Sequence, residues 1–346
     1  MPVKYKEIGT IQGGIFSSGI TGTVKDSMPM KDAAVSTGLA FLEGELEKID
    51  PKIRQPLSII TWPRDIPVKT GGGWVEVLSA MGVNYGIQGG GMEDSIIADG
   101  ANQIPVIQFD MNKEQYRTHV FSAVMRINYI DLQRSKITGR SLEQLAQDGI
   151  RASYDKHMDR NTYLGFKQFG CFGLLNQPTV PVSNVQAGTI SKKTKWEEKT
   201  PDEILADINE AITKTWERAE FASEAVPNHI LLPFKQYIYL STTRLTELAD
   251  ETILSFLLKK NVAKQNGVDL VIAATQYAKG AGAGGTDRMA VYVNNDRFMA
   301  MEELVPLNRI MTQPKTDTLS YDSVYAANIS EVEIFYDQTI SYVDGI

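Results

Sequence analysis

Apolar and polar residues follow several different periods along this chain, and glycine interrupts them often in the first hundred positions. Residues 1–55 carry one helical signal, because three leucines recur at i, i+3 and i+7: Leu39, Leu42 and Leu46. The rest of this stretch shows no period. Two interpretations remain open for it: a frayed terminus, or an arm that becomes ordered only against a partner chain.

Residues 57 to 104 predict extended chain. Leu57–Trp62 and Trp74–Leu78 are rich in β-forming residues, and the glycine triplets Gly71–Gly73 and Gly89–Gly91 flank the second run. Glycine adopts left-handed backbone dihedrals without a steric cost, so each triplet is suited to a flexible turn. A strand between two such turns predicts a long hairpin or a mobile flap that projects from the body.

Two helices have clear start signals. Ser141, with Gln144 three residues later, predicts a helix that runs to about Leu164. Its expected inner face carries Leu142, Leu145, Gly149 and Ala152. Thr200, followed by Pro201 and Glu203, predicts a second helix with a complete capping box. The expected buried stripe of this helix is Ile204, Ile208, Ile212 and Trp216.

The remaining elements alternate without the regular rhythm of a doubly wound sheet. Runs of β-forming residues predict strands at Thr118–Leu132, Pro227–Pro233, Asp269–Ala274 and Met289–Val293, and a last alternating strand from Val332 to Tyr342. Leu240–Lys260 is predicted to be helical. This order indicates an α+β fold.

Composition narrows the possible functions. The 42 acidic and 35 basic residues give a net charge of −7, which argues against a protein that grips nucleic acid through a basic face. One cysteine and three histidines exclude an internal disulfide and leave little material for a metal site. The apolar runs are too short for a membrane span, and the first residues lack a signal peptide. We therefore expect a soluble protein kept in a reducing compartment.

Several short motifs match catalytic or binding signatures, but the elements beside them or their order along the chain do not fit those functions. Gly280–Gly285 satisfies G-x-G-x-x-G, yet a strand is predicted after it where a dinucleotide site needs a helix, so a hairpin loop is the better interpretation. Ser153 with Lys156, and Lys69–Gly71, match S-x-x-K and K-T-G in the reverse of the order that penicillin-recognising enzymes use.

Other polar residues are interpreted as structural. Asp155, His157 and Asp159 alternate on the predicted helix and cannot converge on one metal, so a solvated face is expected. The basic run Lys192–Lys195 is interpreted as an exposed loop, and Cys171 as a small buried apolar residue. No catalytic, cofactor-binding or metal-ligating residue is predicted, and no cofactor is expected.

From Thr118 onward the chain resembles the major capsid proteins of tailed bacteriophages, and among them a family first catalogued as a domain of unknown function. The passage Gly170–Pro178 is similar to the family's G-x-x-GLLN-x-P. Three further stretches follow in the family's order: Thr200–Asn209, Pro227–Pro233 and Asp287–Asp296 with the β-rich tail. The segment before the predicted loop carries no family signature.

The resemblance implies the tailed-phage major capsid fold (Johnson fold). It implies an N-terminal arm at 1–55, an extended β-hairpin loop region at 56–105, a peripheral domain at 106–176 with a spine helix at 141–164, an axial domain at 177–327, and a closing strand of the peripheral domain at 328–346. Some relatives form covalent cross-links from a loop lysine. Lys69 lies in the expected loop, but its asparagine and acid partners cannot be matched here, so no cross-link is predicted.

The function that this resemblance implies is a major capsid protein, not an enzyme, that self-assembles as hexamers and pentamers into an icosahedral shell around double-stranded DNA. Its partners would be copies of itself, with scaffold, portal and decoration proteins left open and no membrane. It would be assembled in the host cytoplasm and end in the virion. Two alternatives stay open: an encapsulin-type bacterial compartment on the same fold, and a soluble enzyme with its site in the axial-like α+β region.

Overall fold

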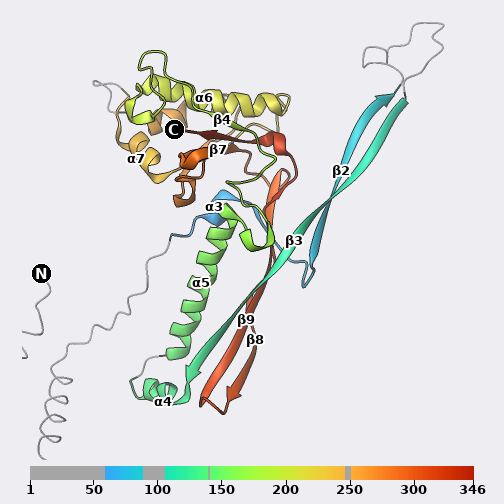
Figure 1. Cartoon of the computed structure of the whole chain (residues 1–346), viewed down its shortest axis with the longest axis vertical. Helices are drawn as coiled ribbons and strands as arrows, with labels where there is room; N and C mark the ends of the chain where they lie inside the picture. Colours follow the sequence, from blue (N-terminus) through green and yellow to red (C-terminus); the bar gives the residue numbers. More distant parts are fainter. Residues whose placement is uncertain (1–58, 89–105, 139–140, 246–250) are drawn as a thin grey trace, which may run out of the picture. The chain divides into compact units, whose positions relative to one another are not determined.

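The computed structural model describes residues 59–88, 106–138, 141–245 and 251–346 (Figure 1). The predicted helix around Leu39–Leu46 and the triplet Gly89–Gly91 lie outside the described residues. In chain order the helices and strands are α3 (Trp62–Asp65), β1 (Val68–Thr70), β2 (Val77–Gln88), β3 (Val106–Asn128), α4 (Tyr129–Thr138), α5 (Leu142–Leu164), β4 (Val182–Asn184), α6 (Pro201–Arg218), β5 (His229–Leu232), α7 (Phe234–Thr242), α8 (Ile253–Lys259), α9 (Val262–Gln265), β6 (Val271–Ala274), β7 (Arg288–Tyr292), β8 (Met299–Lys315), β9 (Ser320–Ser330), β10 (Glu333–Ile334) and β11 (Ile340–Asp344).

Strand β3 organises the first sheet, whose order is β1-β8-β9-β3-β2. Its first half pairs with β2, from Val106 opposite Gln88 to Arg117 opposite Val77. Its second half pairs with β9 on the other side, from Thr118 to Asn128. The predicted hairpin is therefore present, but its return strand lies within 106–117, beyond the expected end of the loop at residue 105.

The long strands β8 and β9 were missed by the sequence analysis. Because they pair with each other and β9 pairs with β3, residues 299–327 join the first sheet, whereas the expected axial domain at 177–327 had included them. Strand β8 has three irregularities in its register with β9 and contains Pro306 and Pro314. In the part of the chain that the structure describes, no strand pairs with its outer edge beyond Glu303.

Helix α5 begins and ends where its capping signals predict. The Ser141 hydroxyl accepts a hydrogen bond from the Gln144 backbone N–H, and the helix extends to Leu164. The expected inner face is wrong, however, because Leu145, Gly149 and Ala152 are exposed. The buried positions are instead Tyr154, Met158, Asp159, Thr162 and Tyr163. The C-terminal half of α5 thus supplies most of the contact with the sheet.

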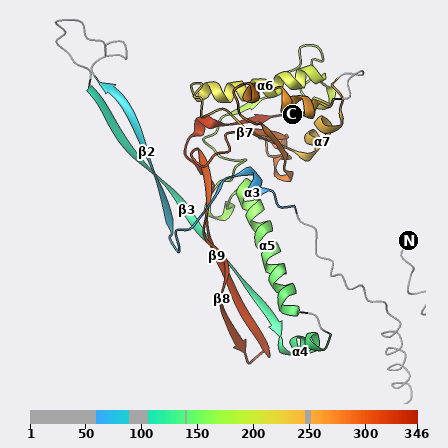
Figure 2. The ribbon, with the colours of Figure 1, turned by 180° about the vertical axis from the view of Figure 1, so that it is seen from behind.

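The second sheet has the order β4-β11-β7-β5-β6 and carries α6 (Figure 2). The predicted capping box is confirmed: Thr200 and Glu203 each accept a hydrogen bond from the other's backbone N–H. The backbone N–H of Thr200 is the main cause that lowers the pKa of Glu203 to about 2. The predicted stripe is also confirmed, since Ile204, Ile208 and Ile212 have no exposed surface and Trp216 packs beside them.

Strands β5, β6 and β7 confirm three predicted strands, and four other predictions need correction. Residues 59–62 are not a strand, because they lead into the short helix α3. Leu240–Lys260 contains the end of α7 and all of α8, not one helix. The last strand is two strands, β10 and β11, separated by a 3-10 turn at Asp337–Thr339. Gly280–Gly285 is a loop but not a hairpin, since β5 separates β6 from β7 in the sheet.

No helix within the described residues is both long and apolar enough to cross a membrane.

We expect Thr200→Ala to lower the free energy of unfolding by about 1 kcal/mol, because it removes the side-chain acceptor at the start of α6. Chemical denaturation followed by circular dichroism measures this change. Thr213→Ala on the exposed face of the same helix is the control, since it removes the same hydroxyl away from the cap. Equal effects from both substitutions would contradict a capping role.

Candidate assembly surface

The hairpin of β2 and the first half of β3 has two chemically different faces. Residues opposite each other in the ladder share a face, and faces alternate along each strand. One face carries Met81, Val83 and Tyr85 of β2, opposite Lys113, Met111 and Phe109 of β3, and Ile107 continues it. The middle of the other face carries small or polar residues, Ala80, Gly82, Asn112, Asp110 and Gln108, while Val106 lies at its far end and Leu78 and Tyr116 at its base.

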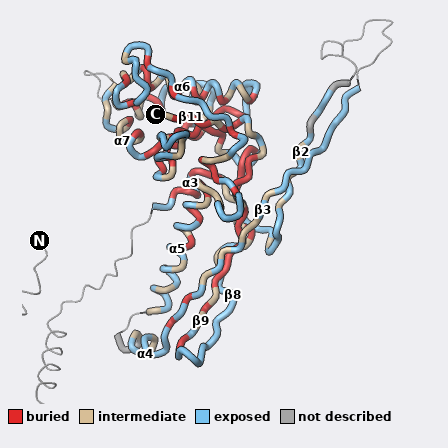
Figure 3. Tube along the Cα trace, viewed as in Figure 1, coloured by how far each residue is buried: buried red, intermediate tan, exposed pale blue. Residues whose placement is uncertain are grey.

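The apolar face is open to solvent. Tyr85 is 78% exposed, Met81 71%, Ile107 70% and Phe109 69%. The first ten residues of β3 are all exposed (Figure 3). Isolated exposed apolar residues are ordinary, but a contiguous set on one face of a hairpin marks an interaction surface. We call Met81, Val83, Tyr85, Ile107, Phe109 and Met111 the hairpin face.

A largely buried turn at Thr61–Ile66 connects the region of the first sheet with that of the second. Asp159 of α5 accepts hydrogen bonds from the backbone N–H groups of Thr61 at 2.7 Å and Trp62 at 3.1 Å. Asp159 is 1% exposed, so the solvated face expected for it is wrong. The other two polar residues of this alternating set agree better with a solvated face, because His157 is exposed and Asp155 is half-buried.

Asp65 is the centre of this turn and has no exposed surface. Its carboxylate accepts hydrogen bonds from Arg64, from Tyr163 of α5 and from the His229 Nε2 of β5, the last at 3.0 Å. Burial alone would raise the pKa of Asp65, but these donors outweigh burial and lower it. The Tyr292 hydroxyl of β7 donates to the Asp65 carbonyl oxygen, which adds a further link to the second sheet.

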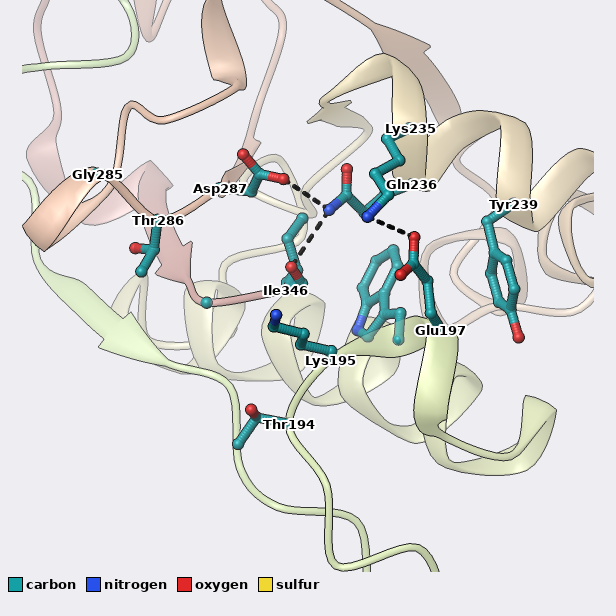
Figure 4. Close-up of a pocket in the computed structure, with 12 residues that line it drawn as sticks. Thr194, Lys195, Glu197, Lys235, Gln236, Tyr239, Gly285, Thr286, Asp287 and Ile346 are labelled. Carbon is teal, nitrogen blue, oxygen red and sulfur yellow. Dashed lines mark hydrogen bonds and ion pairs between the residues drawn. The ribbon is translucent and has the colours of Figure 1, made fainter.

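A cleft of about 380 Å³ lies in the second sheet's region (Figure 4). Lys235 of α7 pairs with Glu197 at 2.6 Å across it. The Gln236 side-chain amide donates to Asp287 at 2.8 Å and to the Ile346 carbonyl oxygen at 3.2 Å. Lys235 and Asp287 are thus already engaged within the chain, and we assign the cleft no ligand.

The other motif residues lie apart from one another. Cys171 is 5% exposed, and burial is the main cause that raises the pKa of its thiol to about 12, which confirms a buried structural residue. Lys192, Lys193 and Lys195 are exposed, as predicted. Within the described ranges, no group of three or more His, Cys, Asp or Glu side chains could hold a metal ion.

One buried carboxyl was not anticipated. Glu333 of β10 is 3% exposed, and its Oε1 atom has no hydrogen-bond partner. Burial, with Glu302 and Glu331 nearby, raises the pKa of Glu333 to about 7, while Ser330 and Lys69 oppose the shift. A local sequence pattern cannot reveal this carboxyl as buried, because β10 pairs with β8, a strand that is distant in the sequence.

Comparisons with known proteins agree with the fold. A sequence model of the family described as major capsid protein matches residues 93–346. The capsid of the myovirus phage XM1 superimposes with a TM-score of 0.71 at 17% identity, covering 88% of this chain and 98% of that one. The capsid of a native GTA particle gives a TM-score of 0.61 at 9% identity, with 87% and 96% covered.

An encapsulin shell protein is also similar. The holo-SrpI encapsulin complex from Synechococcus elongatus gives a TM-score of 0.53 at 10% identity, covering 88% of this chain and 94% of that one. No curated protein sequence matches the chain closely enough to serve as a relative. The structural matches establish the tailed-phage capsid fold for this chain.

Because the folded state raises the pKa of Glu333, it binds that proton more tightly than the unfolded chain does. The contribution of Glu333 to the free energy of unfolding is therefore greatest below pH 4.5. It decreases by roughly 3 kcal/mol in total as the pH rises to about 7. We expect Glu333→Gln to remove this loss, so the variant gains stability relative to wild type as pH rises. Urea unfolding from pH 4.5 to 8 tests this, with Glu217→Gln on the surface as the control. A difference between variant and wild type that does not change with pH would contradict it.

Proposed function

The chain belongs to the major capsid protein family, and from this premise we propose that its copies assemble as hexamers and pentamers into an icosahedral shell around double-stranded DNA. The family assigns it the role of a phage capsid shell protein and a place in the virion. The observation that carries the proposal is the hairpin face, an apolar surface that the described part of its own chain leaves uncovered.

The proposed mechanism is docking of the hairpin face onto a neighbouring copy. Burying apolar surface contributes about 25 cal/mol per Å² before the entropic cost of association. The opposite face, with Asp110, Asn112 and Gln108, keeps one side of the hairpin compatible with water. A two-faced hairpin of this kind binds in one orientation, as a subunit interface requires.

The domain layout proposed for this shell follows the strand pairing. We assign the first sheet with α5 to the peripheral domain and the second sheet with α6 to the axial domain. Residues 1–55 remain proposed as an N-terminal arm. The network around Asp65 supports a firm joint between the two domains, because its donors come from both sheets' regions.

The contents of the shell and its other partners are part of the proposal. The net charge of −7 supports a shell that encloses DNA without gripping it, since like charges resist adhesion. We also propose that the shell assembles in the host cytoplasm and that it contacts scaffold, portal and decoration proteins. We also propose that the chain carries no enzymatic activity.

The similarity to an encapsulin favours a second candidate, a bacterial compartment that would hold protein cargo instead of DNA. The lower TM-score of that match, 0.53 against 0.71 for the phage capsid, ranks it second. Nuclease-resistant DNA in particles isolated from their natural source would support the phage capsid. A packaged protein without DNA would support the compartment.

Expression of the whole chain, followed by size-exclusion chromatography and negative-stain electron microscopy, tests the assembly itself. Closed shells, tubes, or rings of five or six copies are the expected result. A stable monomer under every assembly condition, including with a co-expressed scaffold protein, would overturn the proposal.

We expect Phe109→Asp to reduce the assembled fraction at least about tenfold, because it places a charge on the surface to be buried and removes about 2 kcal/mol of apolar burial per copy. Light scattering and electron microscopy measure assembly. Gln108→Asp is the matched control, since it adds the same carboxylate to the adjacent residue on the opposite face. Both variants should unfold like wild type because both positions are exposed. Equal assembly of the two variants would contradict docking through the hairpin face.

A further inference from the structure

The chain between β1 and β2 has to cross the first sheet. Strand β1 lies beside β8 at one edge and β2 lies beside β3 at the other. Residues Gly71–Glu76, here called the crossover, make this passage. The crossover is held to β8 at its start, where the Gly71 and Gly73 N–H groups donate to the carbonyl oxygens of Glu303 and Leu304 at 3.2 and 3.3 Å. It is held to β3 at its end, where Thr118 N–H donates to the Glu76 carbonyl oxygen.

Asn328 of β9 lies beneath the middle of the crossover. Its sequence neighbours Ala327 and Ile329 belong to the core with Tyr154 and Met158 of α5, so the Asn328 side chain points to the opposite face of the sheet. There its Nδ2 atom donates to the carbonyl oxygens of Gly73 at 3.1 Å and Val75 at 3.0 Å. One buried amide thus holds two successive points of the crossover.

The orientation of this amide is determined by its surroundings. Asn328 is 1% exposed, and the two groups in front of it are both acceptors, so its nitrogen must face them. Its Oδ1 atom is buried and has no hydrogen-bond partner. A buried polar atom without a partner is rare and calls for an explanation. Here the explanation is that Nδ2 must face the two carbonyl oxygens, which turns Oδ1 away from them.

The crossover also fits closely against the sheet. Gly72 has φ +121°, and a Cβ atom at this position would lie 2.5 Å from Leu304 Cδ2. The positive φ favours glycine, and a side chain at this position would also displace the buried Leu304 side chain of β8.

We propose that Asn328 is a positioning residue that latches the crossover and so fixes the direction in which the hairpin leaves the sheet. The hairpin has two connections to the sheet, strand β3 and the crossover. With the latch closed both connections act, and the hairpin has one direction. With the latch open the crossover keeps its backbone hydrogen bonds to β8 and its bonds to Thr118 but loses its attachment to β9. The hairpin then has a wider range of directions about the point where the partner of β3 changes from β2 to β9, at Arg117 and Thr118. The consequence for assembly rests on the proposed function, since hairpin direction then sets where a neighbour docks.

Distances between spin labels on the unassembled full-length chain test the latch. One label replaces Gln108 on the hairpin and the other replaces Lys156 on the exposed side of α5, through cysteine at both positions. Cys171 stays in place because its thiol is buried and has a pKa of about 12. We expect one narrow distance distribution in wild type and a broad one in Asn328→Leu, whose side chain branches at the same atom but cannot donate a hydrogen bond. Ser323→Ala, another buried polar residue of β9, should match wild type.

A narrow, unshifted distribution in a folded Asn328→Leu protein would overturn the proposal. If that variant does not fold, hydrogen exchange on the wild-type chain decides. The Gly71 and Gly73 amides, which donate to β8, should then be protected like the amides of β9, and exchange about tenfold or more faster at these two amides would overturn the latch. Because these measurements use unassembled protein, they stay valid even if the chain forms no shell.

Discussion

A single strand with two different partners is the constraint on which the rest of this structure depends. Strand β3 is 23 residues long. It pairs with β2 up to Arg117 and with β9 from Thr118 onward. Beyond that point α5 covers one face, which buries Met125 and Ile127. Before that point no helix of the described ranges covers the strand, and its first ten residues are exposed. The exposed hairpin face and the buried core are thus two consequences of one continuous strand.

Polar residues, and not only apolar ones, join the two sheets. Asp65 receives donors from both regions, Asp159 of α5 receives donors from the turn, and each carboxylate is almost fully buried. Removal of one partner from such a network leaves a buried charge uncompensated, which costs far more than the loss of a surface pair. The turn at Thr61–Ile66 therefore resists partial opening.

The sequence predicted the elements whose signals are local. The capping box at Thr200, the stripe at Ile204, Ile208 and Ile212, and the buried strand β5 all follow from neighbours within a few residues. Strand β8 could not be predicted in this way, because it is an exposed edge with two prolines, a composition that argues against a strand. Asp159 was assigned to solvent because its partner, Thr61, lies 98 residues away. Gly82 and Gly86 also interrupt the alternation of apolar and polar residues along β2, so the sequence did not reveal the hairpin face.

The irregular outer edge of β8 has a consequence for a protein made in many identical copies. A regular open edge would offer evenly spaced donors and acceptors, and copies could add strand to strand without limit into fibres. Pro306 and Pro314 each lack an N–H, and the shifts in register with β9 disturb the spacing between them. The edge is therefore a poor template for fibre growth. Newly made chains at high concentration are therefore less prone to aggregate into fibres before they form ordered contacts with one another.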